Sequence, residues 1–161
     1  MLERRPLVAE DEPFLRELYG TTRPDLAAWE PAAREALVDM QLRAQRRAWE
    51  TRFPGSTDEL LLRDGRPVGR IWVAWQPDAC VLVDMILLPE LRRSGIGTSI
   101  VGGIIAEAEQ RELPVRVTVE RTNTASLAFC EKLGFEQRGA DEVYVVLERP
   151  VSRARPPRAS E

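Results

Sequence analysis

The most informative absence in this chain is histidine, because none occurs among its 161 residues. Without histidine the chain lacks the commonest general base, the Ser/His and Cys/His nucleophilic pairs, and the usual ligands of zinc enzymes. Any proton transfer must therefore use a carboxylate, a cysteine, a tyrosine, the single lysine Lys132, a terminal amine or water. We expect no metal cofactor.

Cysteines and long apolar runs are also scarce. Cys80 and Cys130 are the only cysteines, and their positions fit neither a metal-binding knuckle nor a disulfide framework. Reduced thiols are the expected state, as in a cytoplasmic protein. No apolar run approaches the roughly 20 residues that span a bilayer, and the first residues contain no apolar segment typical of a secretory signal. We therefore expect a cytoplasmic protein without a membrane partner.

Positive charge is not in excess, because the formal net charge is −3. A chain with this balance offers no general attraction to nucleic acid, so we expect no nucleic-acid partner. The length fits one domain with one core, which we place at residues 1–149. Residues 150–161 are rich in arginine and proline and have little to bury, so we expect them to form a disordered tail.

Hydrophobic periodicity predicts the element order β-α-α-β-β-β-α-β-α-β-β. The longest element is a helix over 31–52, in which Leu37, Met40, Ala44 and Ala48 recur at helical spacing and are expected to form the apolar face. The strands that follow are separated by short turns containing Asp-Gly or Pro-Asp, which is typical of hairpins.

A predicted βαβ unit lies at the centre of the chain, formed by a strand at 80–88, a helix beginning at Ile96 and a strand at 115–119. Its two strands should run parallel with a right-handed connection. The other strands should be antiparallel. The predicted fold class is α/β, with a mixed, mostly antiparallel sheet, a central parallel pair and helices on both faces.

The turn between the strand at 80–88 and the following helix has the sequence PELRRSGIGT and combines positive charge with bare backbone. A helix start exposes free N–H groups and the positive end of the helix dipole, which together bind anions. Gly95 and Gly97 leave those N–H groups uncovered, and Arg92 and Arg93 add charge. Phosphate is the natural ligand, and a tight turn with solvated arginines is the structural alternative. The Walker and dinucleotide patterns do not match, since Ile100 stands where a third glycine belongs.

Two motifs in this region resemble those of the GNAT family, the GCN5-related N-acetyltransferases. Arg92-x-x-Gly95-x-Gly97 is similar to the family's acetyl-CoA pyrophosphate loop, and the segment 123–135, NTASLAFCEKLGF, is similar to its later motif. The resemblance covers roughly residues 2–149. It implies a GNAT-like sheet whose central parallel strands separate at their C-terminal ends, and acetyl-CoA as co-substrate.

The activity implied by the resemblance is transfer of an acetyl group to a primary amine by direct attack in a ternary complex. A non-catalytic acyl-CoA-binding or regulatory module is the alternative that stays open. The acceptor is expected to be a small-molecule or peptide amine, and a homodimer is also open.

The resemblance also implies which residues bind CoA. They come from a strand end, a loop and the later motif, and are Ile86, Leu87, Leu88, Arg92, Arg93, Ser94, Gly95, Ile96, Gly97, Thr98, Asn123 and Ser126. The loop should bind the pyrophosphate through backbone N–H groups, and the strand end should pair with the pantetheine arm as an added strand would. Asn123 has a second interpretation as a helix N-cap.

Each predicted catalytic residue has more than one interpretation. Cys130 stands where the family usually has a tyrosine that protonates the departing thiolate, so it is either that proton donor or a small core residue. Asp84 interrupts an apolar strand and is the first candidate for the base that deprotonates the amine, with an ion pair to Arg70 or Arg116 as the alternative. Glu120, at the end of the next strand, is the second candidate, with a solvated strand end as the alternative.

Overall fold

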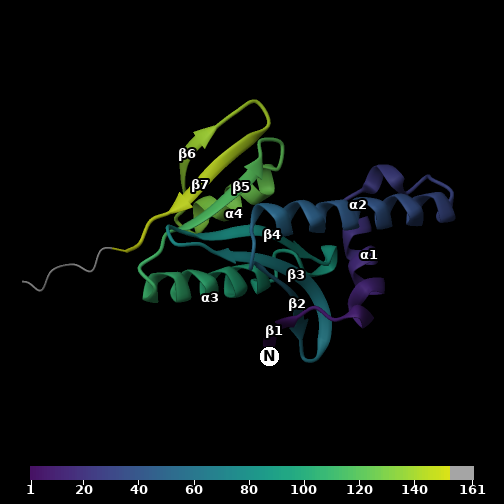
Figure 1. Cartoon of the computed structure of the whole chain (residues 1–161), viewed down its shortest axis with the longest axis horizontal. Helices are drawn as coiled ribbons and strands as arrows, with labels where there is room; N and C mark the ends of the chain where they lie inside the picture. The colour runs from purple at the N-terminus through teal and green to yellow at the C-terminus, as the bar shows by residue number, and fades with distance from the viewer. Residues whose placement is uncertain (153–161) are drawn as a thin grey trace, which may run out of the picture.

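The computed structural model describes residues 1–152, so most of the predicted tail at 150–161 lies outside the described residues. The strands are β1 Leu2–Pro6, β2 Thr57–Arg63, β3 Arg66–Trp75, β4 Cys80–Leu87, β5 Val115–Glu120, β6 Glu136–Ala140 and β7 Tyr144–Arg149. The helices are α1 Glu12–Gly20, α2 Pro31–Arg52, α3 Ile96–Gln110 and α4 Thr124–Lys132 (Figure 1). Short 3-10 turns occupy Ala9–Asp11, Pro24–Leu26 and Pro89–Leu91. The predicted order of helices and strands is confirmed.

The strands form one sheet in the order β1-β2-β3-β4-β5-β7-β6. β4 and β5 are parallel, and the other neighbouring pairs are antiparallel. The parallel pairing joins only Cys80–Leu82 to 115–117, although β4 runs on to Leu87 and β5 to Glu120. The predicted mixed sheet and the separation of its central strands are therefore confirmed.

One face of the sheet is covered by α3 and α4 and holds the main apolar core. Every third or fourth residue of α3 is buried, as its pattern of Ile96, Ile100, Ile104 and Ala108 predicts. These side chains meet residues that alternate along the strands, among them Ile71, Val73, Cys80, Leu82, Val117, Val145 and Leu147. We call this side of the sheet the α3 face.

The opposite side of the sheet, which we call the α2 face, is covered in part by α1 and α2, and Figure 1 shows α2 lying across the strands with α1 near its N-terminal half. The prediction of the α2 apolar stripe was wrong. Val38 and Leu42 are the buried positions, whereas Met40 is 60% exposed. Helical spacing fits both stripes, but Val38 and Leu42 carry more apolar area to bury than the alanines do. No helix in the described part is long and apolar enough to cross a membrane.

Candidate functional site

The arginine–glycine turn places a set of backbone N–H groups together at the start of α3. Arg93 and Gly95 both have left-handed backbone conformations, with φ of 62° and 84°. The first hydrogen bond of α3 joins the N–H of Ser99 to the carbonyl of Gly95 at 3.0 Å. The N–H groups of Ile96, Gly97 and Thr98 therefore have no acceptor within the helix, and they can bind an anion at the positive end of its dipole.

The side chains of this turn are mostly exposed. Arg92, Arg93 and Ser94 face solvent, and the Nε of Arg92 donates to the carbonyl of Leu87 at 3.4 Å. The Ile96 side chain, by contrast, is buried in the core, so only its backbone is available to a ligand. The turn thus combines exposed guanidinium groups with free backbone donors, which is the chemistry that phosphate requires.

Gly97 also leaves space open in a direction that its sequence position did not predict. A Cβ at Gly97 would lie 3.5 Å from Met85 Cε and Phe129 Cζ, and 3.6 Å from Leu87 Cδ1. It would therefore point toward the end of β4 and toward α4, rather than over the turn. The missing side chain leaves room between β4 and α4 in addition to uncovering an N–H group.

The end of β4 has one paired and one unpaired edge. Ile86 and Leu87 pair with Arg70 and Gly69 of β3, but β5 pairs with β4 no further than Leu82. Leu88 lies just past the strand, and its N–H donates to Val68 at 3.0 Å. The edge of β4 on the β5 side can therefore accept an extended ligand in the manner of an added strand.

Asn123 caps α4, as its second interpretation predicted. Its Oδ1 accepts the N–H of Ser126 at 3.1 Å, which satisfies one of the free donors of the helix start. Asn123 is exposed, and within residues 1–152 its side-chain nitrogen has no acceptor. A contact between Asn123 and CoA stays a prediction.

A β-bulge decides which face of the sheet Asp84 occupies. Trp72 of β3 pairs with Asp84, but the next residue, Val73, pairs with Leu82, so Val83 is an extra residue on β4. Without it, Asp84 would share the α3 face with Leu82, because side chains alternate along a strand. With it, Asp84 lies on the α2 face beside Trp72.

The predicted ion-pair alternative for Asp84 was wrong. Arg70 binds Asp58 at two points, with distances of 2.6 Å from Nε to Oδ1 and 2.7 Å from Nη2 to Oδ2. Arg116 binds Glu148 at 3.0 Å. Both arginines are thus occupied by other carboxylates. The Oδ2 atom of Asp84 is buried and has no hydrogen-bond partner in the described chain.

Burial raises the pKa of Asp84 from its ordinary value of 3.8 to about 6. The loss of hydration is the main cause, and the nearby negative charge of Asp58 acts in the same direction. Arg70 and the backbone N–H of Met85 lower the pKa, but by less. A carboxyl that titrates in this range is suited to accept a proton near neutral pH.

Glu120 lies on the same face as Asp84, at the exposed end of β5. Val81 of β4 lies on the α2 face, because its neighbours Cys80 and Leu82 lie on the α3 face, and it pairs with Arg116 of β5. Glu120 follows Arg116 by an even number of residues and therefore also lies on the α2 face. Its partner on β7 is Tyr144, which is 43% exposed. Glu120 and Tyr144 are accessible groups at the edge of this face.

Cys130 lies in the apolar core rather than at an open surface. Its side chain is 5% exposed and belongs to the cluster on the α3 face. Burial raises the pKa of its thiol to about 11. These surroundings favour the interpretation of Cys130 as a core residue, and its role as a proton donor stays a prediction.

Aromatic residues on the α2 face mainly pack against one another. Trp49 of α2 meets Trp72 edge-on, with ring centroids 5.3 Å apart, and Trp72 Nε1 donates to Ser56 Oγ at 2.7 Å. Trp29 is 48% exposed. Sequence reasoning missed Gln45 of α2, whose Oε1 atom is, like Oδ2 of Asp84 and Oε2 of Glu59, a buried acceptor without a hydrogen-bond partner in the described chain. No spacing or motif distinguishes it from other polar residues of the helix.

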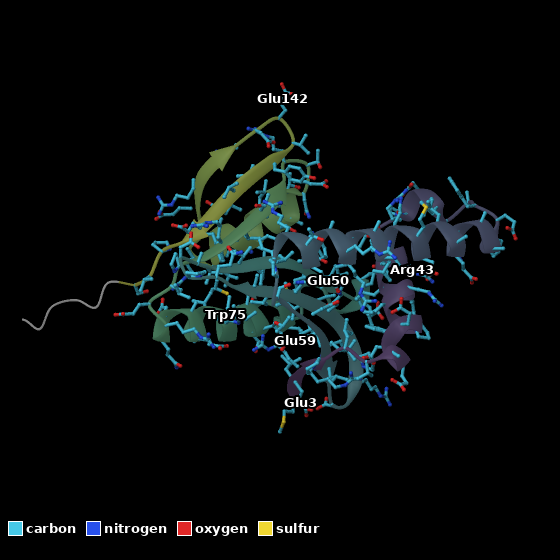
Figure 2. All side chains as sticks on the ribbon, viewed as in Figure 1. Glu3, Arg43, Glu50, Glu59, Trp75 and Glu142 are labelled. Carbon is cyan, nitrogen blue, oxygen red and sulfur yellow. The ribbon has the colours of Figure 1, made fainter. Side chains whose placement is uncertain are left out.

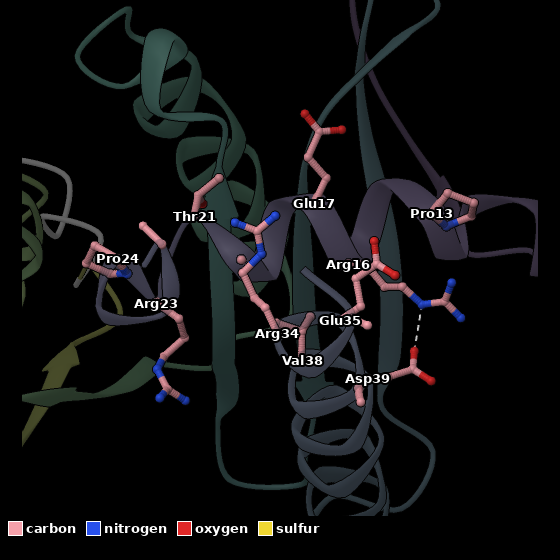
Figure 3. Close-up of a pocket in the computed structure, with 14 residues that line it drawn as sticks. Pro13, Arg16, Glu17, Thr21, Arg23, Pro24, Arg34, Glu35, Val38 and Asp39 are labelled. Atoms are coloured by element: carbon pink, nitrogen blue, oxygen red, sulfur yellow. Dashed lines mark hydrogen bonds and ion pairs between the residues drawn. The ribbon is translucent and has the colours of Figure 1, made fainter. Parts of the chain in front are cut away.

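A separate hollow of about 820 Å³ lies between α1, the turn Pro24–Leu26 and the first half of α2 (Figure 3). Its charged lining residues include both signs, and Arg16 donates to Asp39 across it at 2.6 Å. None of the site residues predicted from the sequence lines this hollow. Among the described residues, no three His, Cys, Asp or Glu side chains gather as metal ligands would.

Comparison with known proteins links this geometry to a family. The model described as "Acetyltransferase (GNAT) family" matches residues 13–135. No relative was found among curated protein sequences.

Solved structures with the same fold include three acetyltransferases. The PaiA N-acetyltransferase of Thermoplasma acidophilum, in complex with coenzyme A, is 18% identical over 93% of this chain and 99% of its own, with a TM-score of 0.71. The ribosomal-protein-S18-alanine N-acetyltransferase of Escherichia coli is 18% identical over 98% of both chains, with a TM-score of 0.63. The N-acetyltransferase PseH of Campylobacter jejuni, in complex with acetyl coenzyme A, is 14% identical over 94% of this chain and 100% of its own, with a TM-score of 0.63. At these identities the likeness shows the fold.

Proposed function

Because the chain belongs to the GNAT acetyltransferase family, we propose that it transfers the acetyl group of acetyl-CoA to a primary amine, by direct attack of the amine on the thioester. The observation that carries the proposal is the joint position of two features at the end of β4. The anion-binding turn follows this strand, and Asp84, whose Oδ2 atom is buried without a hydrogen-bond partner in the described chain, lies within the strand.

The proposed acetyl-CoA site uses backbone more than side chains. Free N–H groups at the start of α3 would bind the pyrophosphate, supported by Arg92 and Arg93. The unpaired edge of β4 beyond Leu82 would hold the extended pantetheine arm. The structures of relatives with coenzyme A or acetyl coenzyme A bound support this choice of co-substrate.

Asp84 is the proposed base. A primary amine is mostly protonated at neutral pH and must lose a proton before its nitrogen can form the new N–C bond. Asp84 accepts that proton, directly or through water, and the C–S bond of the thioester breaks as the amide forms. Its raised pKa and unoccupied Oδ2 suit this task. Glu120 is the second candidate for the same role.

One observation favours the alternative of a non-catalytic acyl-CoA-binding module. Cys130 stands where the family resemblance implies a tyrosine proton donor, and burial raises the pKa of its thiol to about 11. In the catalytic proposal the departing thiolate takes its proton from Tyr144 or water instead. Tyr144 is exposed on the face that carries Asp84.

The test is turnover of acetyl-CoA with a panel of amines, measured as released thiol, in the wild type, Asp84→Asn and Glu3→Gln. Glu3 is exposed on β1, the edge strand that β2 and β3 separate from β4, and Figure 2 shows it at the opposite side of the molecule from Glu142 on the β6–β7 turn. Asp84→Asn should lower turnover by about 10²- to 10⁴-fold, the range for a lost general base, while Glu3→Gln should not.

Three other outcomes would contradict parts of the proposal. Full turnover by Asp84→Asn on an accepted amine would exclude Asp84 as the base. Thermal stabilisation by CoA without turnover of any amine would favour the binding module. If CoA does not stabilise the protein and no amine is acetylated, both functions are excluded.

A further inference from the structure

The row of residues that crosses the sheet at Asp84 contains a second carboxylate. Asp58 of β2 pairs with Trp72 of β3, and Trp72 pairs with Asp84 of β4, so the three side chains share the α2 face in one line. Arg70 lies two residues from Trp72 on β3 and faces the same side. It is therefore a diagonal neighbour of both carboxylates, at a separation that a long side chain can cross.

Arg70 is bound to only one of these two carboxylates. Both contacts of its two-point ion pair go to Asp58, while Asp84 Oδ2 is buried without a partner in the described chain. The guanidinium is fixed in place, because Arg70 is 2% exposed and lies 5.0 Å from the ring centroid of Trp72 and 5.8 Å from that of Trp49. A buried guanidinium of this kind requires a carboxylate. If Asp58 were neutral, Asp84 would be the other carboxylate within diagonal reach of Arg70.

From this arrangement, and resting on the proposed function of Asp84, we propose that Asp58 is a positioning residue that holds Arg70 away from Asp84 and so leaves Asp84 free to engage the acceptor amine. The acceptor's ammonium group then takes the place beside Asp84 that Arg70 would otherwise fill. Asp58 acts through Arg70 and does not touch the reacting atoms.

The other arginines of the α2 face already form ion pairs with other carboxylates. On the helix side, Arg46 of α2 lies 3.0 Å from Glu12 of α1 and 3.7 Å from Asp58. It therefore reinforces the carboxylate that holds Arg70.

On the β5 side, Arg116 is bound to Glu148 and Asp78, and Glu120 lies at the exposed strand end. Tyr19 of α1 donates its hydroxyl hydrogen to Gln41. Arg70 is thus the cation whose release would most directly change the state of Asp84.

The closing experiment compares Asp58→Asn, Asp58→Glu and the double variant Asp58→Asn/Arg70→Met. Asp58→Asn keeps the shape but removes the charge that holds Arg70. Arg70→Met removes the guanidinium while keeping a long apolar side chain, so the double variant has no buried unpaired cation. Glu59→Gln is the control, because Glu59 is the next residue of β2, points to the α3 face, and has its ion pair with Arg4 rather than with Arg70.

Crystal structures, carboxyl NMR titration of Asp84 and turnover with an accepted amine provide three readouts. In the structure of Asp58→Asn we expect Arg70 within ion-pair distance of Asp84. The titration midpoint of Asp84 should then fall by about one pH unit or more, and turnover should fall by about 10- to 100-fold. Asp58→Glu should stay close to the wild type. The double variant should regain turnover over Asp58→Asn and return the Asp84 midpoint to the wild-type value or above.

The double variant separates this proposal from a purely structural role for the ion pair. If Arg70 merely stabilised the fold, its removal could not restore turnover per folded molecule, and a double variant no better than Asp58→Asn would overturn the proposal. An Arg70 that stays on the introduced asparagine in Asp58→Asn, with an unchanged Asp84 titration, would also overturn it. If the wild type acetylates no amine, the proposed function fails, whereas the structures and the titration still decide whether Asp58 controls the partner of Asp84.

Discussion

The two faces of the central sheet bury different kinds of side chain. On the α3 face, α3 and α4 cover a continuous apolar cluster in which Ile104 and Val101 are fully buried. On the α2 face, the buried groups include Arg70, and one oxygen each of Asp84 and Gln45 lacks a hydrogen-bond partner in the described chain. The α3 face has one such atom, Oε2 of Glu59, but Arg4 lies 3.2 Å from it. A fold gains stability from the first arrangement and loses it through the second. The α2 face is also where we propose that the acceptor binds, and each prediction below tests one side of this contrast.

The largest expected effect on stability belongs to the α3 face. Ile104→Ala should lower the free energy of unfolding by about 2–5 kcal/mol, because it removes buried methyl groups and leaves a cavity. Urea denaturation measures the loss. Leu37→Ala on the partly exposed side of α2 is the control and should cost clearly less. Equal losses from the two variants would contradict the view that the α3 face carries the core.

On the α2 face, replacing Asp84 should stabilise the protein, and the gain should depend on pH. The rise of the Asp84 pKa from 3.8 to about 6 corresponds to about 3 kcal/mol. Below about pH 4 the carboxyl is protonated in both the folded and the unfolded state, so it costs nothing. As the pH rises through 6, the unfolded state releases the proton more readily, and the folded wild type loses stability.

The measurement is the unfolding free energy of wild type and Asp84→Asn at a series of pH values. The variant should gain up to about 3 kcal/mol over the wild type between about pH 4 and pH 7. A difference that is constant with pH would show that Asp84 has no raised pKa. A wild type that gains stability relative to Asp84→Asn as the pH rises would mean that the carboxylate is paired.

The third prediction concerns the turn at the start of α3. Free CoA at one hundred times its dissociation constant should stabilise the wild type by about 2.7 kcal/mol. Gly97→Asp should remove most of this gain, since a carboxylate there would neutralise the positive helix end that the pyrophosphate needs and would fill the space toward Met85 and Phe129. Gly103→Asp makes the same change in an exposed part of α3 with no atom nearby, and it should keep the gain. Thermal unfolding with and without CoA distinguishes the two.

Most of the α3 face could be predicted from the sequence, because the burial of regularly spaced apolar residues determines it. The apolar spacing of α3 and the βαβ order led directly to the parallel strands β4 and β5. The pairing of β4 with β5 stops after Leu82, and this separation agrees with what the resemblance to the GNAT family implied. Local patterns were sufficient here because nearly every buried position on this face holds an apolar side chain.

The α2 face was harder to predict, because its features depend on contacts between distant strands. The bulge at Val83 has no sequence signal, yet it decides which face Asp84 occupies. Asp58 lies in β2 beside Arg70, but charged residues are poor strand formers, so the sequence gives no sign that Asp58 belongs to this strand. In α2, helical spacing fitted Met40 as well as Val38, and only the packing separated them.

The smallest predicted effect tests whether Asn123 does more than cap α4. Asn123→Ala removes the side-chain oxygen that accepts the Ser126 N–H, so stability should fall by about 1 kcal/mol. Asn123→Ser keeps a capping oxygen and should stay within a few tenths of a kcal/mol of the wild type, but it lacks the amide nitrogen. If that nitrogen donates to CoA, both variants should bind CoA about 3- to 10-fold more weakly, the effect of one neutral hydrogen bond. Calorimetric titration with CoA measures the affinity, and urea denaturation measures the cap. If Asn123→Ser binds CoA as tightly as the wild type does, Asn123 only caps α4. The contact with CoA that the family resemblance implies would then be wrong for this chain.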